Sequence, residues 1–255
     1  MELSTEAGWN QTPSDWSMLL DLAPESCFGL EIDGLLAATT TLVCYGRSLA
    51  WLGMVLTRSR YRGRGFAHRL IAHALTVANQ RAIRTVKLDA TEMGLPLYQK
   101  FDFRIEQTIE RYVSTVRPQR SPGPSTHLLT LTQIAQLDRA TCRAGRSNVL
   151  RLLAERSPPA SEHGAFVFSR PGLRARFLGP CSASSAESAL RLVSQHLSRD
   201  DGPWFWDLLP SNPAAASLAS EFGFQVNRTL VRMVRGADLV TNAATSFATA
   251  GFELG

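Results

Sequence analysis

Acidic residues are absent from a long stretch of this 255-residue chain, since no Asp or Glu lies between Gly34 and Leu88. The same stretch carries nine basic residues, namely Arg47, Arg58, Arg60, Arg62, Arg64, Arg69, Arg81, Arg84 and Lys87. Because the whole chain has a formal net charge of only +5, the remainder is mildly acidic. A local excess of this size predicts a polyanionic ligand, of which nucleic acid is only one kind. A chain that is basic throughout is excluded.

Long apolar runs and grouped cysteines are also missing. No apolar run approaches the roughly 18 residues of a membrane-spanning helix, and no basic-then-apolar leader opens the chain. The four cysteines form no CxxC pair, which disfavours structural zinc and a disulfide framework. His68 and His73 lie outside the i, i+4 spacing of a helical metal pair. We therefore predict a globular, soluble and cytoplasmic protein with no metal and no membrane partner.

Strands and helices alternate in the predicted first half. The clearest helix follows residue 65, because apolar residues recur there at the spacing of one buried face: Ala67, Leu70, Ile71, Ala74, Leu75 and Ala78. Around it we predict a helix at 12–22, strands at 28–31, 35–44, 49–57 and 85–90, a short helix at 95–100 and an extended segment at 103–116. Three prolines in residues 117–125 then indicate a linker.

The second half repeats the end of the first. We predict for it a helix, strands near 165–168 and 175–178, a helix at 186–197, a strand at 204–208, a helix at 212–222 and a strand at 226–234. Six residues recur at a constant offset of 121: Leu97, Phe101, Phe103, Thr108, Arg111 and Val113 match Leu218, Phe222, Phe224, Thr229, Arg232 and Val234. Asp89 and Asp207 close the preceding strands. The matching order of elements favours an internal duplication.

The most informative motif runs from Arg62 to Ala67 and reads Arg-Gly-Arg-Gly-Phe-Ala. It follows a predicted strand and opens a predicted helix, so backbone N–H groups and the positive end of the helix dipole would face a ligand there. Glycines allow a close backbone approach, and guanidinium groups suit phosphate oxygens. The pattern predicts a pyrophosphate site. An exposed basic loop and an RNA-contacting segment are the alternatives, although neither RGG repetition nor interleaved aromatic residues support RNA.

These residues resemble the central motif of the GNAT superfamily of acyl-CoA N-acyltransferases, Arg/Gln-x-x-Gly-x-Gly/Ala, which Arg62, Gly65 and Ala67 match. The preceding residues 51–56 resemble the central strand of that family. Residues 97–103, Leu-Tyr-Gln-Lys-Phe-Asp-Phe, resemble its downstream ending, with Asp102 where the family usually has Gly. In the second half, Asn-Pro-Ala-Ala at 212–215, Glu-Phe-Gly-Phe at 221–224 and residues 231–236 are similar to a second GNAT-like domain of a two-domain bacterial subgroup.

The resemblance implies an α+β fold with two tandem GNAT-like domains, each a twisted mixed α/β sheet flanked by helices. The domains would comprise a catalytic, acetyl-CoA-binding domain at 1–117, a linker at 118–125, a degenerate domain at 126–236 and a tail at 237–255. The family normally has a strand before its first helix, and none is predicted here. The apolar tail at 237–255 is a candidate to cover the sheet edge that the missing strand leaves exposed.

The resemblance also implies a site where two parallel strands separate. Backbone groups of Met54, Val55 and Leu56 would hold the pantetheine arm, and those of Arg62, Gly63, Arg64, Gly65, Phe66 and Ala67 the pyrophosphate. Tyr98 would protonate the departing thiolate, for which a phenol has a suitable pKa; a half-buried structural tyrosine is the alternative. The implied reaction is acetyl transfer from acetyl-CoA to a primary amine by direct attack. The alternative function is acyl-CoA sensing without transfer.

No general base is evident, because residues 48–57 contain no acid. The candidates are Asp89, Glu92, Asp15 and Glu31, each of which could equally be a helix cap or a solvated surface charge. A water chain, or an amine that arrives neutral, would remove the need for a base. An acyl-cysteine route through Cys44 lacks a neighbouring histidine.

The second half lacks the features of the first. Its expected phosphate loop at 181–186 has neither arginine nor a glycine pair, and Ala219 replaces Tyr98, so we predict that it binds no CoA productively. Trp9 and Trp16 are candidates to line the acceptor side, or core residues. The acceptor is predicted to be a small-molecule or peptide amine, with no nucleic-acid partner, and the protein to be a monomer or homodimer.

Overall fold

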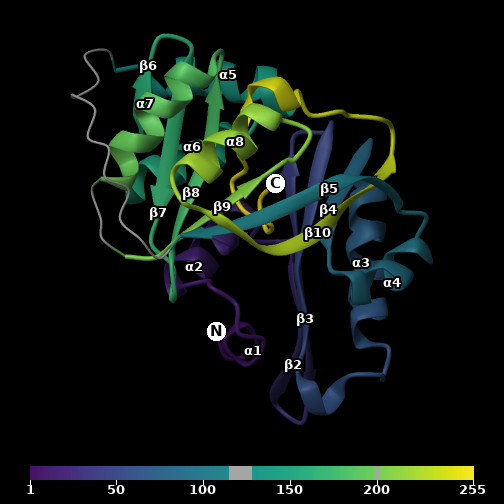
Figure 1. Ribbon diagram of the computed structural model, residues 1–255. Helices are drawn as coiled ribbons and strands as arrows, with labels where there is room; N and C mark the ends of the chain where they lie inside the picture. Colours follow the sequence, from purple (N-terminus) through teal and green to yellow (C-terminus); the bar gives the residue numbers. More distant parts are fainter. Residues whose placement is uncertain (115–127, 199–201) are drawn as a thin grey trace. The chain divides into compact units, whose positions relative to one another are not determined.

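The computed structural model describes residues 1–114, 128–198 and 202–255, which form two compact units (Figure 1). Unit 1 consists of Met1–Glu106, Arg232–Asp238 and Glu253–Gly255, and unit 2 of Gln107–Val231 and Leu239–Phe252. Each unit therefore contains a segment from the opposite half of the sequence. The predicted linker at 118–125, with the domain boundaries at its two ends, lies outside the described residues.

Unit 1 follows the predicted element order. Its elements are α1 (Glu2–Glu6), α2 (Pro13–Leu22), β1 (Cys27–Ile32), β2 (Leu35–Tyr45), β3 (Leu49–Thr57), η1 (Ser59–Tyr61), α3 (Phe66–Gln80), β4 (Thr85–Ala90), η2 (Glu92–Gly94), α4 (Leu95–Gln99) and the start of β5 (Arg104–Ser114). Helix α1 was not predicted from the sequence. Thr12 and Asp15 start α2 as a capping box in which each side chain accepts the other's backbone N–H.

The sheet of unit 1 is mixed. Strands β1, β2 and β3 are antiparallel neighbours, β3 runs parallel to β4, and β4 is followed by the 232–236 end of β10 (Gln225–Gly236). Helix α3 packs on β2 and β3 with its predicted apolar face, so Leu70, Ile71 and Ala74 are buried. No strand precedes α1 among the described residues, and β1 forms the edge.

Unit 2 departs more from the prediction. It contains most of β5, then α5 (Leu131–Cys142), α6 (Ser147–Arg156), β6 (Ala160–Glu162), β7 (Ala165–Arg170), β8 (Arg176–Ala183), α7 (Ala186–Leu197), β9 (Trp204–Leu208), α8 (Pro213–Glu221), the first part of β10, η3 (Ala243–Thr245) and β11 (Ser246–Ala248). Two helices open the second half where one was predicted. The tail adds a strand, which was also not predicted.

The sheet of unit 2 has the same mixed character. Strands β6, β7 and β8 are antiparallel neighbours, β8 is parallel to β9, and β9 pairs with β5. Helix α7 packs on β7 and β8 (Figure 1). Trp204 and Trp206 of β9 are fully buried in the core, and Trp206 meets Phe224 edge to face at 5.3 Å.

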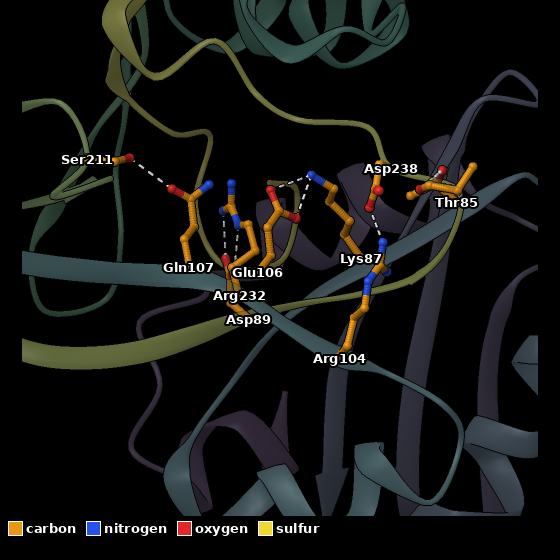
Figure 2. A network of polar contacts seen from close by, with 10 residues as sticks. Thr85, Lys87, Asp89, Arg104, Glu106, Gln107, Ser211, Arg232 and Asp238 are labelled. Carbon is orange, nitrogen blue, oxygen red and sulfur yellow. Dashed lines mark hydrogen bonds and ion pairs between the residues drawn. The ribbon is translucent and has the colours of Figure 1, made fainter.

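A buried ion pair joins each unit to its exchanged strand. In unit 1, Arg232 donates to both carboxylate oxygens of Asp89, at 2.8 and 2.9 Å (Figure 2). In unit 2, Arg111 donates to both carboxylate oxygens of Asp207, at 2.7 and 2.6 Å. The four residues are the duplicated positions found in the sequence. The two halves have therefore exchanged strands reciprocally, each completing a mixed sheet with a strand from the other.

Candidate active site

The loop between η1 and α3 holds the predicted phosphate motif. Gly63 and Gly65 both have φ of +76°, a conformation that favours glycine, and a Cβ added at either would meet nothing within 4 Å. Gly65 is the N-cap of α3, and no side chain caps this helix. Arg62, Gly63, Arg64 and Gly65 are exposed, whereas Phe66 and Ala67 are half-buried. The loop thus presents bare backbone to solvent.

Six consecutive N–H groups, those of residues 63–68, have no hydrogen-bond acceptor among the residues that the structure describes. The first helical hydrogen bond of α3 runs from Arg69 N to the carbonyl of Gly65 at 3.0 Å. The N-terminus of a helix carries partial positive charge, and its unpaired donors bind anions. This segment therefore has the donors, the dipole and the open space that a phosphate group needs.

Arginines reinforce the positive charge of this loop. The guanidinium groups of Arg60 and Arg64 lie 4.8 and 5.3 Å from the ring centroid of Tyr61. Arg58, by contrast, is paired with acids of α1, at 2.6 Å from Glu2 and 3.9 Å from Glu6. The pKa of Glu2 is lowered because it hydrogen-bonds with Arg58. Arg60, Arg62 and Arg64 are thus better placed than Arg58 to meet an anionic ligand.

Strand β3 is irregular where the family resemblance places the pantetheine arm. Its register against β2 shifts between Thr39 and Thr41, and Met54 has φ of +51°, as in a bulge. Thr39 donates to the Met54 carbonyl at 2.9 Å and Thr40 to the Gly53 carbonyl at 3.1 Å. Met54 and Leu56 are buried, and Val55 is half-buried.

Strands β3 and β4 separate after a short parallel stretch. Among the described residues, their pairing is confined to Ala50 with Val86 and Trp51 with Lys87. Because β3 continues to Thr57, no described residue pairs with its bulged half on the β4 side. Its backbone groups there are available to a bound chain. The separation of the two parallel strands that the resemblance implied is therefore present.

Tyr98 lies on α4 and is 9% exposed. Its ring meets that of Phe103 edge to face at 6.0 Å, and a Cβ on Gly94 would lie 3.2 Å from its Cε2. Burial raises the pKa of Tyr98 above its usual value. The phenol therefore remains protonated at neutral pH, which is the form required of a proton donor.

Each of the four acids considered as general bases either accepts structural hydrogen bonds or is exposed to solvent. The Asp89 side chain is fully enclosed and accepts both hydrogen bonds from Arg232, and Asp15 caps α2. Glu31 and Glu92 are exposed. Lys87, 2% exposed, pairs with Glu106 at 2.7 Å, and desolvation lowers the pKa of this lysine (Figure 2).

Two other candidates of the sequence analysis have structural contacts. Trp16 donates from Nε1 to the Ser4 hydroxyl at 3.2 Å, a contact that links α2 to α1. Cys44 contacts the Leu42 carbonyl at 3.9 Å and Arg81 at 3.8 Å. Arg81 also donates to Ser26 at 2.7 Å, so this arginine links the end of α3 to the residue before β1.

In unit 2 the segment equivalent to the phosphate loop is closed. Ser185 is the N-cap of α7 and its hydroxyl accepts the N–H of Ser188 at 3.2 Å. Glu187 adds negative charge in the first turn, where α3 has no acid. Ala219, at the position of Tyr98, is fully buried in the core. Helix α7 thus satisfies its own N-terminus and repels an anion.

The tail strand β11 fills the place where the parallel strands of unit 2 separate. Strands β8 and β9 pair over 176–178 and 204–206, and beyond this β8 pairs instead with β11, through Ser182 with Ser246 and Cys181 with Ala248. On the other side, Thr249 N donates to the Asp207 carbonyl at 2.8 Å and Trp206 Nε1 to the Phe247 carbonyl at 2.7 Å. The backbone groups left open in unit 1 are here occupied by the chain itself.

Sequence reasoning missed Arg232 as a site-forming residue and the tail strand. The constant offset of 121 between Arg111 and Arg232 indicated a duplication, but it gave no sign that the two halves exchange strands. In the part of the chain that the structure describes, no group of three or more His, Cys, Asp or Glu side chains could hold a metal ion. None of the described helices is long and apolar enough to cross a bilayer.

Known proteins resemble both halves. Profiles described as "Acetyltransferase (GNAT) family" and "Acetyltransferase (GNAT) domain" match residues 2–103 and 134–248. An uncharacterized N-acetyltransferase, YitH of Bacillus subtilis (strain 168), is 22% identical over 240 residues, which cover 88% of this chain and 83% of YitH.

Solved structures show the same fold. A Pyrococcus horikoshii crystal structure described as an acetyltransferase superposes with a TM-score of 0.86 at 20% identity, covering 95% of this chain and 84% of the other. A GCN5-related N-acetyltransferase from Anabaena variabilis has a TM-score of 0.59 at 12% identity, covering 92% and 69%. With a mixed sheet flanked by helices in each unit and a family profile on each half, the chain belongs to the GNAT acyltransferases as a two-domain member.

Proposed function

We propose that the first half binds acetyl-CoA and transfers its acetyl group to a primary amine. One observation carries the proposal: six consecutive N–H groups at the N-terminus of α3 lack acceptors among the described residues. A pyrophosphate has enough oxygens to engage several of them, and Arg62 and Arg64 lie in the same loop. The 3′-phosphate of CoA accounts for further positive charge, such as that of Arg60.

The bulged part of β3 supports the thioester end of this proposal. Its unpaired backbone groups would hydrogen-bond the amides of the pantetheine arm as a neighbouring strand does. The acyl carbonyl would then lie near Met54 and Val55, where backbone N–H groups stabilise the oxyanion of the tetrahedral intermediate. An amine attacks this carbon, the C–S bond breaks and the sulfur takes a proton from Tyr98.

Replacing Tyr98 by phenylalanine is expected to lower kcat about 100-fold and to leave the Kd for acetyl-CoA nearly unchanged, because proton donation to the thiolate is lost while the binding groups remain. Release of free CoA thiol measures the rate, and isothermal titration the Kd. Since burial raises the pKa of Tyr98, wild-type kcat should show no decline from tyrosine ionisation between pH 8 and 10. An unaltered rate in the variant would remove Tyr98 from the mechanism.

Isothermal titration should give one acetyl-CoA per chain, since α7 caps its own N-terminus and β11 occupies the strand separation of unit 2. Two equivalent sites would contradict this account of the second half. The variant Ser185→Gly removes the cap without creating the arginines of the first loop, so it should leave the stoichiometry at one.

Thiol release in the presence of a primary-amine panel tests the function itself. The panel should include spermidine, tyramine and a peptide with a free N-terminus, because the fold does not select among amines. Steady, amine-dependent release supports transfer. Acetyl-CoA binding without release for any amine would favour a sensor, and absence of binding would refute the site.

A further inference from the structure

We infer that Glu253 is the general base of this site. The inference rests on the proposed function, because it assigns a residue to that same reaction. Strand β3 contains no acid, so a carboxylate base for this site would come from another element of unit 1. Glu253 belongs to the tail segment Glu253–Gly255, which lies in unit 1, whereas Leu239–Phe252 lie in unit 2.

Glu253 lies directly against the strand that would hold the thioester. A Cβ built on Gly53 would lie 3.1 Å from the Glu253 carbonyl oxygen and 3.3 Å from its Cα. Gly53 immediately precedes Met54, where the bulge of β3 lies. A residue without a side chain thus allows the tail to approach this part of the strand closely.

Neighbouring contacts fix the tail at this position. The Tyr45 hydroxyl donates to the Leu254 carbonyl at 2.7 Å. The backbone of Gly255, with φ of +79°, packs so closely on Trp51 that a Cβ there would lie 2.5 Å from the indole ring. These contacts hold the backbone around Glu253 in place. The entropy cost of positioning its carboxylate for reaction is therefore smaller than it would be on a mobile tail.

A buried hydroxyl marks the same spot as polar. Thr41 is 1% exposed, and its Oγ1 has no hydrogen-bond partner in the described part of the chain. It lies 3.3 Å from the same Cβ position on Gly53 that Glu253 approaches. Buried hydroxyls usually have partners, so one that lacks a protein partner points to a ligand group. The acceptor amine has N–H groups that would donate hydrogen bonds to Thr41 Oγ1 and to a carboxylate.

Glu253 differs from the other acids of unit 1 in being both buried and adjacent to β3. It is 2% exposed, whereas Glu92 is exposed. Asp89 and Glu106 lie instead on β4 and β5, where they pair with Arg232 and Lys87. The Cα of Glu253 lies beside the strand that would hold the thioester, so its side chain starts next to the position that an attacking amine would take.

The proton balance of the reaction then closes. Glu253 takes a proton from the ammonium form of the acceptor, and the free amine forms the new C–N bond. The C–S bond breaks, and Tyr98 gives its proton to the sulfur. The nitrogen loses its second proton to the Tyr98 phenolate, and Glu253 releases its own to water. One ammonium and one thioester thus give one amide, one thiol and one proton.

The test uses the full-length chain with acetyl-CoA and the amine panel. Glu253→Gln should lower kcat about 100-fold or more, the usual range for loss of a general base, with the Kd for acetyl-CoA within about 2-fold of wild type. Glu253→Ala should be equally slow and should regain activity on addition of formate, which can enter the vacated space. Glu92→Gln is the matched control and should match wild type.

A Glu253→Gln variant with the wild-type rate overturns the assignment. So does a slow Glu253→Ala variant that formate does not restore, because that result indicates a structural role. If the wild-type chain binds acetyl-CoA but releases no thiol with any amine, the proposed transfer fails, and the base assignment fails with it. Rapid wild-type turnover with an inactive, formate-restored Glu253→Ala variant supports both.

Discussion

Replacing Arg232 by methionine is expected to lower the free energy of unfolding by about 3–5 kcal/mol, the usual cost of leaving one partner of a buried ion pair uncompensated. The Arg232 and Asp89 side chains are only 3% and 0% exposed, so water cannot replace the lost guanidinium. Arg232 also lies 4.7 Å above the ring of Trp51, an attraction lost in the same variant. Urea unfolding followed by circular dichroism measures the change.

The location of the damage is the sharper part of this prediction. Although Arg232 belongs to the second half of the sequence, hydrogen exchange should accelerate in β3 and β4 of the first half. Arg111→Met should instead loosen β9, because Arg111 pairs with Asp207. Arg191→Met is the control, since this arginine is 45% exposed and its ion pairs should contribute about 0–1 kcal/mol. A loss at Arg232 no larger than at Arg191 would contradict the buried-pair account.

Replacing Gly65 by glutamate is expected to weaken acetyl-CoA binding by about 100-fold or more. The new carboxylate would lie at the N-cap of α3, where the proposed pyrophosphate sits, and like charges placed together cost several kcal/mol. Gly65 also has φ of +76°, which a side chain tolerates poorly, at about 1–2 kcal/mol. Isothermal titration with acetyl-CoA checks the affinity, and thermal unfolding checks that the variant is folded.

Two further variants separate charge from backbone strain. Gly65→Ala carries the strain without the charge and should weaken binding far less than Gly65→Glu. Gly46→Glu places the same residue at another exposed glycine of unit 1, with φ of +64° and open space around it. It should leave the Kd unchanged. Equal losses at Gly46 and Gly65, or none at Gly65, would refute the anion site.

Local features of this chain were predictable from the sequence because they depend on nearby residues. The apolar spacing in residues 67–78 gave helix α3, and the Arg-Gly-Arg-Gly turn after an apolar strand gave the loop that precedes it. The predicted mixed-sheet fold and the GNAT family are both confirmed. Helix α1 was missed because five residues carry too little periodicity to indicate a helix.

The partners of distant residues could not be predicted in the same way. The sequence marked Asp89 and Arg232 as repeated positions, but their contact spans 143 residues and depends on which strand enters which sheet. Asp89 was therefore predicted as a candidate base, because only the structure shows that its carboxylate is paired with Arg232. The apolar tail was expected to cover the exposed sheet edge, but β1 remains at the edge and β11 pairs with β8 instead. Neither this pairing nor the approach of Glu253 to Gly53 has a local signal in the sequence.

The reciprocal strand exchange has a consequence for synthesis on the ribosome. The first half cannot complete its sheet until Arg232 has emerged, 143 residues after Asp89. At a translation rate of about 5–20 residues per second, this delay is about 7–30 s. During that time β4 presents an unpaired edge and Asp89 an unneutralised charge, a nascent state exposed to aggregation. A gene that lost its second half would therefore lose the strand that completes the sheet of its first.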